Sequence, residues 1–364
     1  YGVRRGQVLL SRSGTIGRTS FVNRTLEGNC VSEHALKITA NYAGYVYAYL
    51  STEVGRSIVK SFTYGAVIDE IEPEHLKNLP IPNAPEEIKR SIHDAVIASY
   101  DLRDQSNDLI DEAQRLLYKA LGLPEKMDLK PKYYAPQAGF RCFTMSSNEL
   151  NNRFDVSYHL PEIKEILSLI SKQAAEVTTL GDPRISKEII LAGVFKRTYV
   201  NKDLGTPFLG GRDITQLAPK VHKYLSYSVH KVRIHKELEV FENYILISDR
   251  GTIGKVQIVP KHWNGWAVSQ NIIKLIPISS SIAGYIYIYL QTSLGQALIK
   301  RETYGSVVDM IDDNNVASIP IPLLKDNSMQ SRINDLVLQA NELRYQAYLK
   351  EQEALQQMEA VLKA

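Results

Sequence analysis

The chain has 364 residues, with 43 Lys/Arg, 40 Asp/Glu and a net charge of +3, which is enough chain for two domains with separate cores. Its 2 cysteines lack metal-ligand spacing, which excludes a zinc site and a disulfide framework and indicates a reducing, cytoplasmic setting. An export signal and an apolar run of about 18 residues are also lacking, so we expect no membrane association.

The positive charge is distributed unevenly along the sequence. Residues 1–70 hold 8 Lys/Arg and 5 Asp/Glu, and residues 181–305 hold 17 and 9, so these two segments carry +11 together and the remainder carries −8. A cation excess confined to two segments favours a polyanionic partner. Scattered solubilising charge is the alternative interpretation.

The first residues of the chain predict two short strands separated by a glycine turn. Strands are expected at Gln7–Leu10 and Leu36–Thr39, and Gly14 and Gly17 fit the turn between them. Because the chain starts at Tyr1, inside a strand-like run, we expect further residues upstream. Residues 1–82 are assigned to a first, N-terminally incomplete domain.

A helix is expected next, from Gly44 to Lys60. Four apolar side chains recur at roughly helical spacing and predict its core-facing side: Tyr45, Tyr49, Val54 and Ile58. Pro80 and Pro82 then end regular structure.

A long helix is predicted in residues 83–122. Glu86–Leu121 contains no Pro or Gly, and this length corresponds to about 54 Å of helix. Apolar and small residues recur at alternating steps of four and three, which is the seam of a coiled coil. The seam residues are Ile88, Ile92, Ala95, Ser99, Leu102, Ser106, Leu109, Ala113, Leu116 and Ala120.

Nearly all of these features recur later in the chain. Gly14–Gly17 (Gly-Thr-Ile-Gly) matches Gly251–Gly254, 237 positions later, and the strand start Ser32–Lys37 matches Ser269–Lys274. At an offset of 240, three segments match: Gly44–Leu50 with Gly284–Leu290, Tyr64–Asp69 with Tyr304–Asp309, and Leu79–Pro82 with Ile319–Pro322. The long helix matches residues 326–364 at an offset of 241. Ordered matches of this number indicate an internal duplication.

The repeat defines the domain boundaries. We assign 123–150 to a linker rich in Pro, Lys and Tyr, 151–322 to a second domain and 326–364 to a C-terminal spacer helix. The second domain has a front end, from Arg153 to Glu162 and a helix at Ile163–Lys172, without a counterpart in the first. The expected fold class is α+β, with two α/β domains joined by a long two-helix coiled coil. Packing between the helices is expected at Ile92, Ala95, Leu102, Leu109, Ile333, Leu336, Ala340 and Leu343.

These residues resemble a known family: the DNA-specificity (S) subunits of type I restriction-modification systems, and their relatives in type IIB systems. The resemblance rests on Arg153–Glu162 as a domain opening, both Gly-Thr-Ile-Gly turns, Ser269-Gln270 and the Pro-Ile-Pro exits into the helices. It implies two target-recognition domains on an antiparallel helical spacer. Glu33 departs from the pattern, since the second copy has Gln270 there.

The resemblance also implies partners and the absence of catalysis in this chain. It implies double-stranded DNA, two methyltransferase (modification) subunits and restriction or motor subunits as partners, with S-adenosylmethionine, ATP and Mg bound only by those subunits. The sequence itself contains no Asn-Pro-Pro-Tyr methyltransferase motif and no phosphate-binding P-loop.

Candidate DNA-binding residues follow from their chemistry and position. Lys and Arg suit phosphates or guanine, whereas Gln and Asn suit adenine. In the first copy the candidates are Arg12, Thr15, Arg18, His34 and Tyr64. In the second they are Lys196, Arg197, Arg212, Arg250, Thr252, Lys255, Gln270, Asn271 and Tyr304. An ordinary structural role in turns remains open for each of them.

Two other functions remain compatible with the sequence. The chain could be a coiled-coil scaffold whose two globular repeats bind proteins. It could also be the recognition portion of a longer fused methyltransferase-nuclease of type II.

Overall fold

The computed structural model describes residues 1–64, 70–124, 142–150, 153–305 and 309–364. The chain divides into two compact units: unit 1 comprises Tyr1–Asp108 and Leu343–Ala364, and unit 2 comprises Leu109–Glu342. Most of the expected linker, and the middle of both segments that follow Tyr64 and Tyr304, lie outside the described residues.

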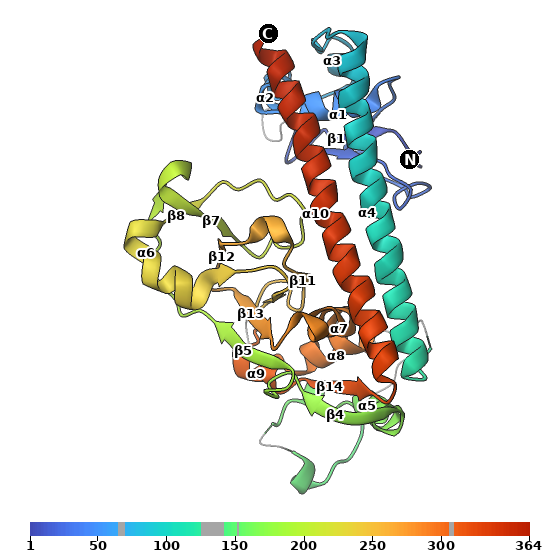
Figure 1. Ribbon diagram of the computed structural model, residues 1–364, viewed down its shortest axis with the longest axis vertical. Helices are drawn as coiled ribbons and strands as arrows, with labels where there is room; N and C mark the ends of the chain where they lie inside the picture. Colours follow the sequence, from blue (N-terminus) through green and yellow to red (C-terminus); the bar gives the residue numbers. More distant parts are fainter. Residues whose placement is uncertain (65–69, 125–141, 151–152, 306–308) are drawn as a thin grey trace. The chain divides into compact units, whose positions relative to one another are not determined.

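Unit 1 contains a three-stranded antiparallel sheet in the order β2-β1-β3. The strands are β1 (Val8–Ser11), β2 (Thr19–Phe21) and β3 (Ala35–Ile38), close to the predicted positions. Val8 and Leu10 alternate inward from β1 and are fully buried, because alternate residues of a strand face the same side. The helices α1 (Ala43–Ser51), α2 (Glu53–Ser61) and α3 (Pro73–Lys77) complete the globular part (Figure 1).

The single helix expected over Gly44–Lys60 is wrong, because the chain forms two helices there. Thr52 adopts an extended conformation, and its side chain accepts a hydrogen bond from the Gly55 amide, so it caps α2. Thr292 caps a helix in the same way in unit 2. The break turns Val54 outward to 46% exposure, so its predicted place in the core stripe is also wrong.

Unit 2 holds three sheets, in the orders β11-β10-β13-β5, β6-β8-β7-β12-β9 and β14-β4. The strands are β4 (Ala174–Thr179), β5 (Ser186–Leu191), β6 (Tyr199–Val200), β7 (Gly205–Leu209), β8 (Tyr224–Ser226), β9 (Glu239–Val240), β10 (Ile245–Ser248), β11 (Val256–Ile258), β12 (Trp266–Val268), β13 (Ile272–Pro277) and β14 (Pro320–Leu324). Among the described pairs, β7–β12 is the parallel one and the others are antiparallel. The α+β class is therefore confirmed, whereas the α/β description of the individual domains is wrong.

Helices of unit 2 pack on each of its three sheets. They are α5 (Pro161–Gln173), α6 (Tyr227–Arg233), a π-helical turn (Ile234–Leu238), α7 (Ser280–Gln291), α8 (Ser293–Arg301) and α9 (Asp313–Ala317). Single 3-10 turns span Ser147–Glu149, Val156–His159, Lys202–Leu204 and Lys261–Trp263. α7 packs on β11 and β13, and its tyrosines Tyr285 and Tyr289 are fully buried in the main core (Figure 1).

The two predicted long helices are present as α4 (Glu86–Ala120) and α10 (Asn327–Lys363). Within unit 1 their segments run in opposite directions, since Ser91 bonds to Gln357 and the Ser99 hydroxyl donates to the Ala347 carbonyl at 2.7 Å. A bond from side chain to backbone of this kind requires the close approach that a small seam residue permits.

The side chains expected to pack between the two long helices are all buried or half-buried. Ile92, Ala95, Ile333 and Ala340 are buried, and Leu102, Leu109, Leu336 and Leu343 are half-buried. Unit 1 also buries a polar network in which Tyr47 and Arg103 bond to Glu351.

Candidate nucleic-acid interface

Both glycine turns have the same backbone geometry. In unit 1, the Ser11 hydroxyl donates to the Thr15 carbonyl at 2.5 Å and accepts from the Arg18 amide at 2.9 Å. In unit 2, Ser248 makes the equivalent bonds to Thr252 and Lys255 at 2.5 and 3.0 Å. The glycines have φ of +69° and +83° in the first turn and +76° and +81° in the second, which side chains with a Cβ rarely adopt. This places Thr15 and Thr252 at exposed tips.

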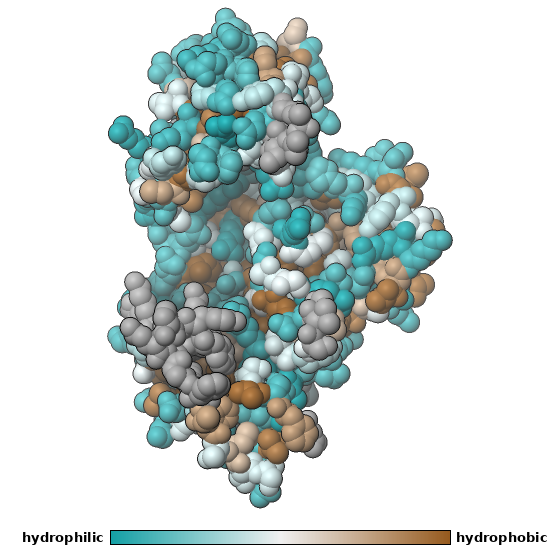
Figure 2. All heavy atoms as spheres, turned by 180° about the vertical axis from the view of Figure 1, so that it is seen from behind, coloured by the Kyte–Doolittle hydropathy of each residue, from teal (hydrophilic) through white to brown (hydrophobic). Residues whose placement is uncertain are grey.

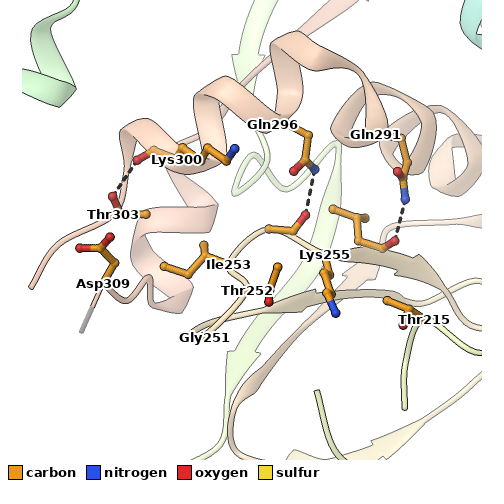
Figure 3. A pocket seen from close by; sticks show the side chains of 12 residues that line it. Thr215, Gly251, Thr252, Ile253, Lys255, Gln291, Gln296, Lys300, Thr303 and Asp309 are labelled. Carbon is orange, nitrogen blue, oxygen red and sulfur yellow. Dashed lines mark hydrogen bonds between the residues drawn. The ribbon is translucent and has the colours of Figure 1, made fainter. Parts of the chain in front are cut away.

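The turn of unit 2 lies against α8. A Cβ on Gly254 would come within 3.2 Å of Gln296 and Ile299, so the close approach needs glycine here. The Gln296 amide donates to the Gly254 carbonyl at 2.8 Å, and the Gln291 amide donates to the Val256 carbonyl at 2.6 Å (Figure 3). Two glutamines of the helices therefore fix the turn and the strand that follows it.

A cavity of about 700 Å³ lies between this turn and the two helices. Figure 3 shows the turn on one side and residues of α7 and α8 on the other. Its lining consists of Thr215, Gly251, Thr252, Ile253, Gly254, Lys255, Val256, Gln291, Gln296, Lys300, Thr303 and Asp309. Two lysines and three threonines line the cavity together with the carboxylate of Asp309 and the apolar side chains of Ile253 and Val256, so its wall is mixed in polarity and in charge.

The arginines that flank the turns have internal carboxylate partners. Arg12 forms ion pairs of 3.0 Å with Glu70 and Glu72, and the guanidinium of Arg250 lies 2.8 Å from Asp249. Burial raises the pKa of Asp249, and its bond to Arg250 opposes the shift. Because these carboxylates compete with a phosphate, Arg12 and Arg250 are poorer candidates than the sequence suggests.

Arg18 and Lys255, at the other side of each turn, differ from them. Neither forms an ion pair with a described residue within 4.0 Å. Arg18 is exposed and Lys255 is half-buried on the wall of the cavity. Both therefore keep their charge available at the turn.

Tyr64 and Tyr304 occupy the same position in both units. Each forms an antiparallel bridge across its loop, to Glu70 and Met310 respectively. The Tyr64 hydroxyl donates to Glu72 at 2.7 Å, and this bond raises its pKa; burial and Asp312 raise the pKa of Tyr304. Both rings remain more than 40% exposed. His34 is exposed, and its Nδ1 forms a hydrogen bond of 2.6 Å with the hydroxyl of Ser13, 21 positions away in the chain.

The remaining candidates lie at one edge of the five-stranded sheet. β7 and β12 are parallel neighbours, so the loops that follow them emerge at the same edge. Arg212 lies in the loop after β7, and Gln270 and Asn271 follow β12. Arg197 reaches this edge as well, because its Nη2 donates to Gln270 Oε1 at 2.5 Å. Lys196 is exposed beside it in the chain.

Several residues that form these surroundings carry no signal in the sequence. The Glu72 carboxylate, the ring of Phe208 near Arg197, and Gln291 and Gln296 behind the turn come from other segments of the chain, whereas Asp249 directly precedes its partner Arg250. Lys300 and Thr303 in the cavity do repeat residues of the first copy, Lys60 and Thr63.

Two further properties concern the described residues alone. No group of three or more His, Cys, Asp or Glu among them could hold a metal ion. None of the helices they form combines the length and apolarity needed to cross a bilayer.

Glycine turns flanked by a cation that is unpaired among the described residues, and polar side chains at one sheet edge, are features that nucleic-acid-binding surfaces use. Residues 195–338 match the model of the family described as "Type I restriction modification DNA specificity domain". The chain therefore carries a type I restriction-modification DNA specificity domain over these residues, and the resemblance of its sequence to that family is confirmed. No curated protein matches the chain.

Solved structures of specificity subunits are similar to the whole chain. The S subunit of a type I restriction-modification system from M. genitalium is 13% identical with a TM-score of 0.39, over 100% of this chain and 83% of that one. The HsdS subunit from Thermoanaerobacter tengcongensis is 16% identical with a TM-score of 0.34, over 99% and 81%. A chain from a structure of the type I R-M system is 17% identical with a TM-score of 0.35, over 100% and 82%.

Proposed function

We propose that this chain is the non-catalytic specificity subunit of a type I restriction-modification complex and that it reads a bipartite DNA sequence, one part with each unit. The match of residues 195–338 to the DNA specificity domain carries this proposal. Unit 1 repeats the hydrogen bonds of the glycine turn and of the helix cap, which supports a second recognition domain of the same kind.

Phosphate contacts would supply most of the affinity, and base contacts the specificity. Arg18, Lys196, Arg212 and Lys255 are the proposed phosphate ligands, because none forms an ion pair with the described part of the chain. Arg197, Gln270 and Asn271 lie at the sheet edge and are proposed to face the bases. Thr15, His34, Tyr64, Thr252 and Tyr304 are proposed to contribute polar contacts from the turns and loops.

We propose that partner subunits, and not this chain, carry out DNA methylation and cleavage. Two methyltransferase subunits would dock on the helices and on the domain surfaces away from DNA, and would supply S-adenosylmethionine-dependent methylation. Restriction or motor subunits would use ATP and Mg. The chain itself would position these partners on a DNA sequence.

Methylation mapping tests this function. The chain is co-expressed with its modification subunit, and modified bases are located by single-molecule sequencing. We expect a split motif with methylated adenines in both halves. An intact complex that leaves no modified motif would contradict the proposal.

A protein-binding scaffold is the rival function. On the described part of the face in Figure 2, apolar side chains form small groups separated by polar ones, which is typical of a solvated surface rather than of a large obligate interface. Salt dependence separates the two functions. Duplex DNA binding that neutralises several phosphates should weaken roughly 1,000-fold or more between about 50 and 200 mM salt, whereas a mainly apolar protein interface should change little.

A further inference from the structure

The arginines of unit 2 fall into two groups. Among the described ones, seven have a carboxylate within 4.0 Å, namely Arg115, Arg153, Arg184, Arg233, Arg250, Arg301 and Arg332. Arg197 and Arg212 form no ion pair within the described part of this unit. Both belong to the polar edge where β7 and β12 end. This edge therefore holds two guanidinium charges that the fold does not neutralise.

Neutral groups hold Arg197 in place. Its Nη2 donates to Gln270 Oε1 at 2.5 Å, and its Cζ lies 5.4 Å from the centre of the Phe208 ring. An amide oxygen and an aromatic face orient a guanidinium while its full charge remains. The rest of the guanidinium makes no hydrogen bond to the described residues and is not sealed from solvent, so its remaining N–H groups are open to a ligand.

Arg212 is fixed through its backbone. Its carbonyl accepts bonds from Thr215 Oγ1 and Gln216 Nε2 at 3.4 and 3.2 Å, and the loop is closed by the Gly210 amide bonding to Asp213 Oδ2 at 2.8 Å. The side chain itself is exposed. A fixed backbone with a free cationic side chain suits a phosphate, for which approximate placement is enough.

The bond between Arg197 and Gln270 changes the role expected for Gln270. Adenine presents one acceptor and one donor in the major groove, so an amide that reads it needs both its oxygen and its nitrogen. Gln270 Oε1 is already the acceptor for Arg197. Arg197 Nη2, by contrast, carries a second N–H, and this hydrogen together with the N–H of the neighbouring nitrogen on the same edge of the guanidinium fits the paired acceptors O6 and N7 of guanine.

We propose that Arg197 is a specificity-determining residue that reads a guanine, that Gln270 is a positioning residue for it, and that Arg212 binds a neighbouring phosphate. The inference rests on the proposed DNA-recognition function. It replaces the adenine-reading role predicted for Gln270 from the sequence. Position 33, the counterpart of Gln270 in unit 1, is a glutamate that lies 3.4 Å from His34, so this arrangement belongs to unit 2.

Selection from a randomised duplex library tests the proposal with the full chain. Wild-type protein should enrich a motif that contains a guanine at one position of one half-site. Arg197→Ala should lose the preference for guanine over other bases there by roughly tenfold or more, and Arg197→Lys should lose most of it because a lysine lacks the planar fork. All other positions of the motif should keep their preferences.

Two variants test the assigned roles. Gln270→Glu preserves the shape but pairs Arg197 with a carboxylate, so the guanine preference should fall; the added negative charge should also weaken binding to random DNA by about the factor expected for the loss of one cation. Arg212→Ala should weaken binding to all sequences by a similar factor without changing base preference. Arg184→Ala is the matched control, because Arg184 is equally exposed but paired with Glu176 and Asp182; it should leave selection unchanged.

The outcomes distinguish a failure of this inference from a failure of the proposed DNA-recognition function. An unchanged guanine preference in Arg197→Ala, in protein with a wild-type thermal transition, would overturn the reading role. An unchanged preference in Gln270→Glu would overturn the positioning role, and a changed base preference in Arg212→Ala would overturn the phosphate role. Wild-type protein that enriches no sequence would instead overturn the proposed function itself.

Discussion

Equivalent residues of the two repeats share backbone bonds but differ in side-chain chemistry. The amides of Arg12 and Asp249 donate to the carbonyls of His34 and Asn271, and their own carbonyls accept from Ile71 and Ile311. At the same backbone position, unit 1 has a cation paired with Glu70 and Glu72, and unit 2 has an anion paired with Arg250. The backbone framework thus tolerates reversal of charge at this position.

His262 provides a prediction at the scale of a single residue. Its Nε2 donates to the Leu217 carbonyl at 2.8 Å beside Trp263 and Trp266, and burial lowers its pKa to about 4. His262 binds a proton near pH 6.5 in the unfolded chain but only near pH 4 in the folded chain. Its contribution to the free energy of unfolding is therefore fully present above pH 6.5 and is lost as the pH falls from 6.5 to 4.

We therefore expect His262 to account for a loss of about 2 kcal/mol in the free energy of unfolding between pH 7 and pH 5. His262→Gln keeps a donor for Leu217 but does not titrate, so it should remove this share of the pH dependence. Urea unfolding at both pH values measures it. His222→Gln, at an exposed position, is the control, and equal pH dependence in wild type and His262→Gln would refute the assignment.

The first helix of each repeat approaches its long helix so closely that only glycine fits. A Cβ on Gly284 of α7 would lie 2.4 Å from the Asn334 carbonyl oxygen, and one on Gly44 of α1 would lie 2.7 Å from that of His93. The Gly284 amide donates to Asn334 Oδ1 at 2.9 Å, and the Gly44 amide to His93 Nδ1 at 3.0 Å. The contact is thus a repeated element of the fold.

Gly284→Ala should destabilise unit 2 by about 1–3 kcal/mol, because backbone must move to admit the methyl group. Gly211→Ala is a matched control in the same unit, since a Cβ there meets no atom within 4 Å. Chemical denaturation compares the two variants. A Gly284→Ala protein as stable as Gly211→Ala would show that the approach of the helices is adjustable.

The sequence predicted the elements that depend on local pattern and on repetition. The strands at β1 and β3, the helices α4 and α10 and the buried seam follow from apolar periodicity and from the lack of Pro and Gly. The break at Thr52 was missed because its cap is a single side-chain bond inside an otherwise helical pattern. The partners of Arg12 and Arg197 could not be predicted, because they come from residues about 60 and 73 positions away in the chain.

At the scale of the whole molecule, α4 and α10 each contribute residues to both units, with boundaries at Asp108 and Glu342. A heptad occupies about 10 Å of helix, which is the length of roughly three base pairs of DNA. If the paired helices set the spacing of the two half-sites, their length is a ruler for the gap in the recognised sequence.

Deleting one heptad from both helices near these boundaries preserves the seam, since the pattern repeats every seven residues. We expect the methylated motif to keep both half-sites and to lose about three base pairs from the gap between them, as seen by single-molecule sequencing. Inserting one heptad in both helices is the matched control and should lengthen the gap by the same amount. A folded, methylation-competent deletion variant with an unchanged gap would refute the ruler, because the spacing would then be determined by the DNA or by the partner subunits.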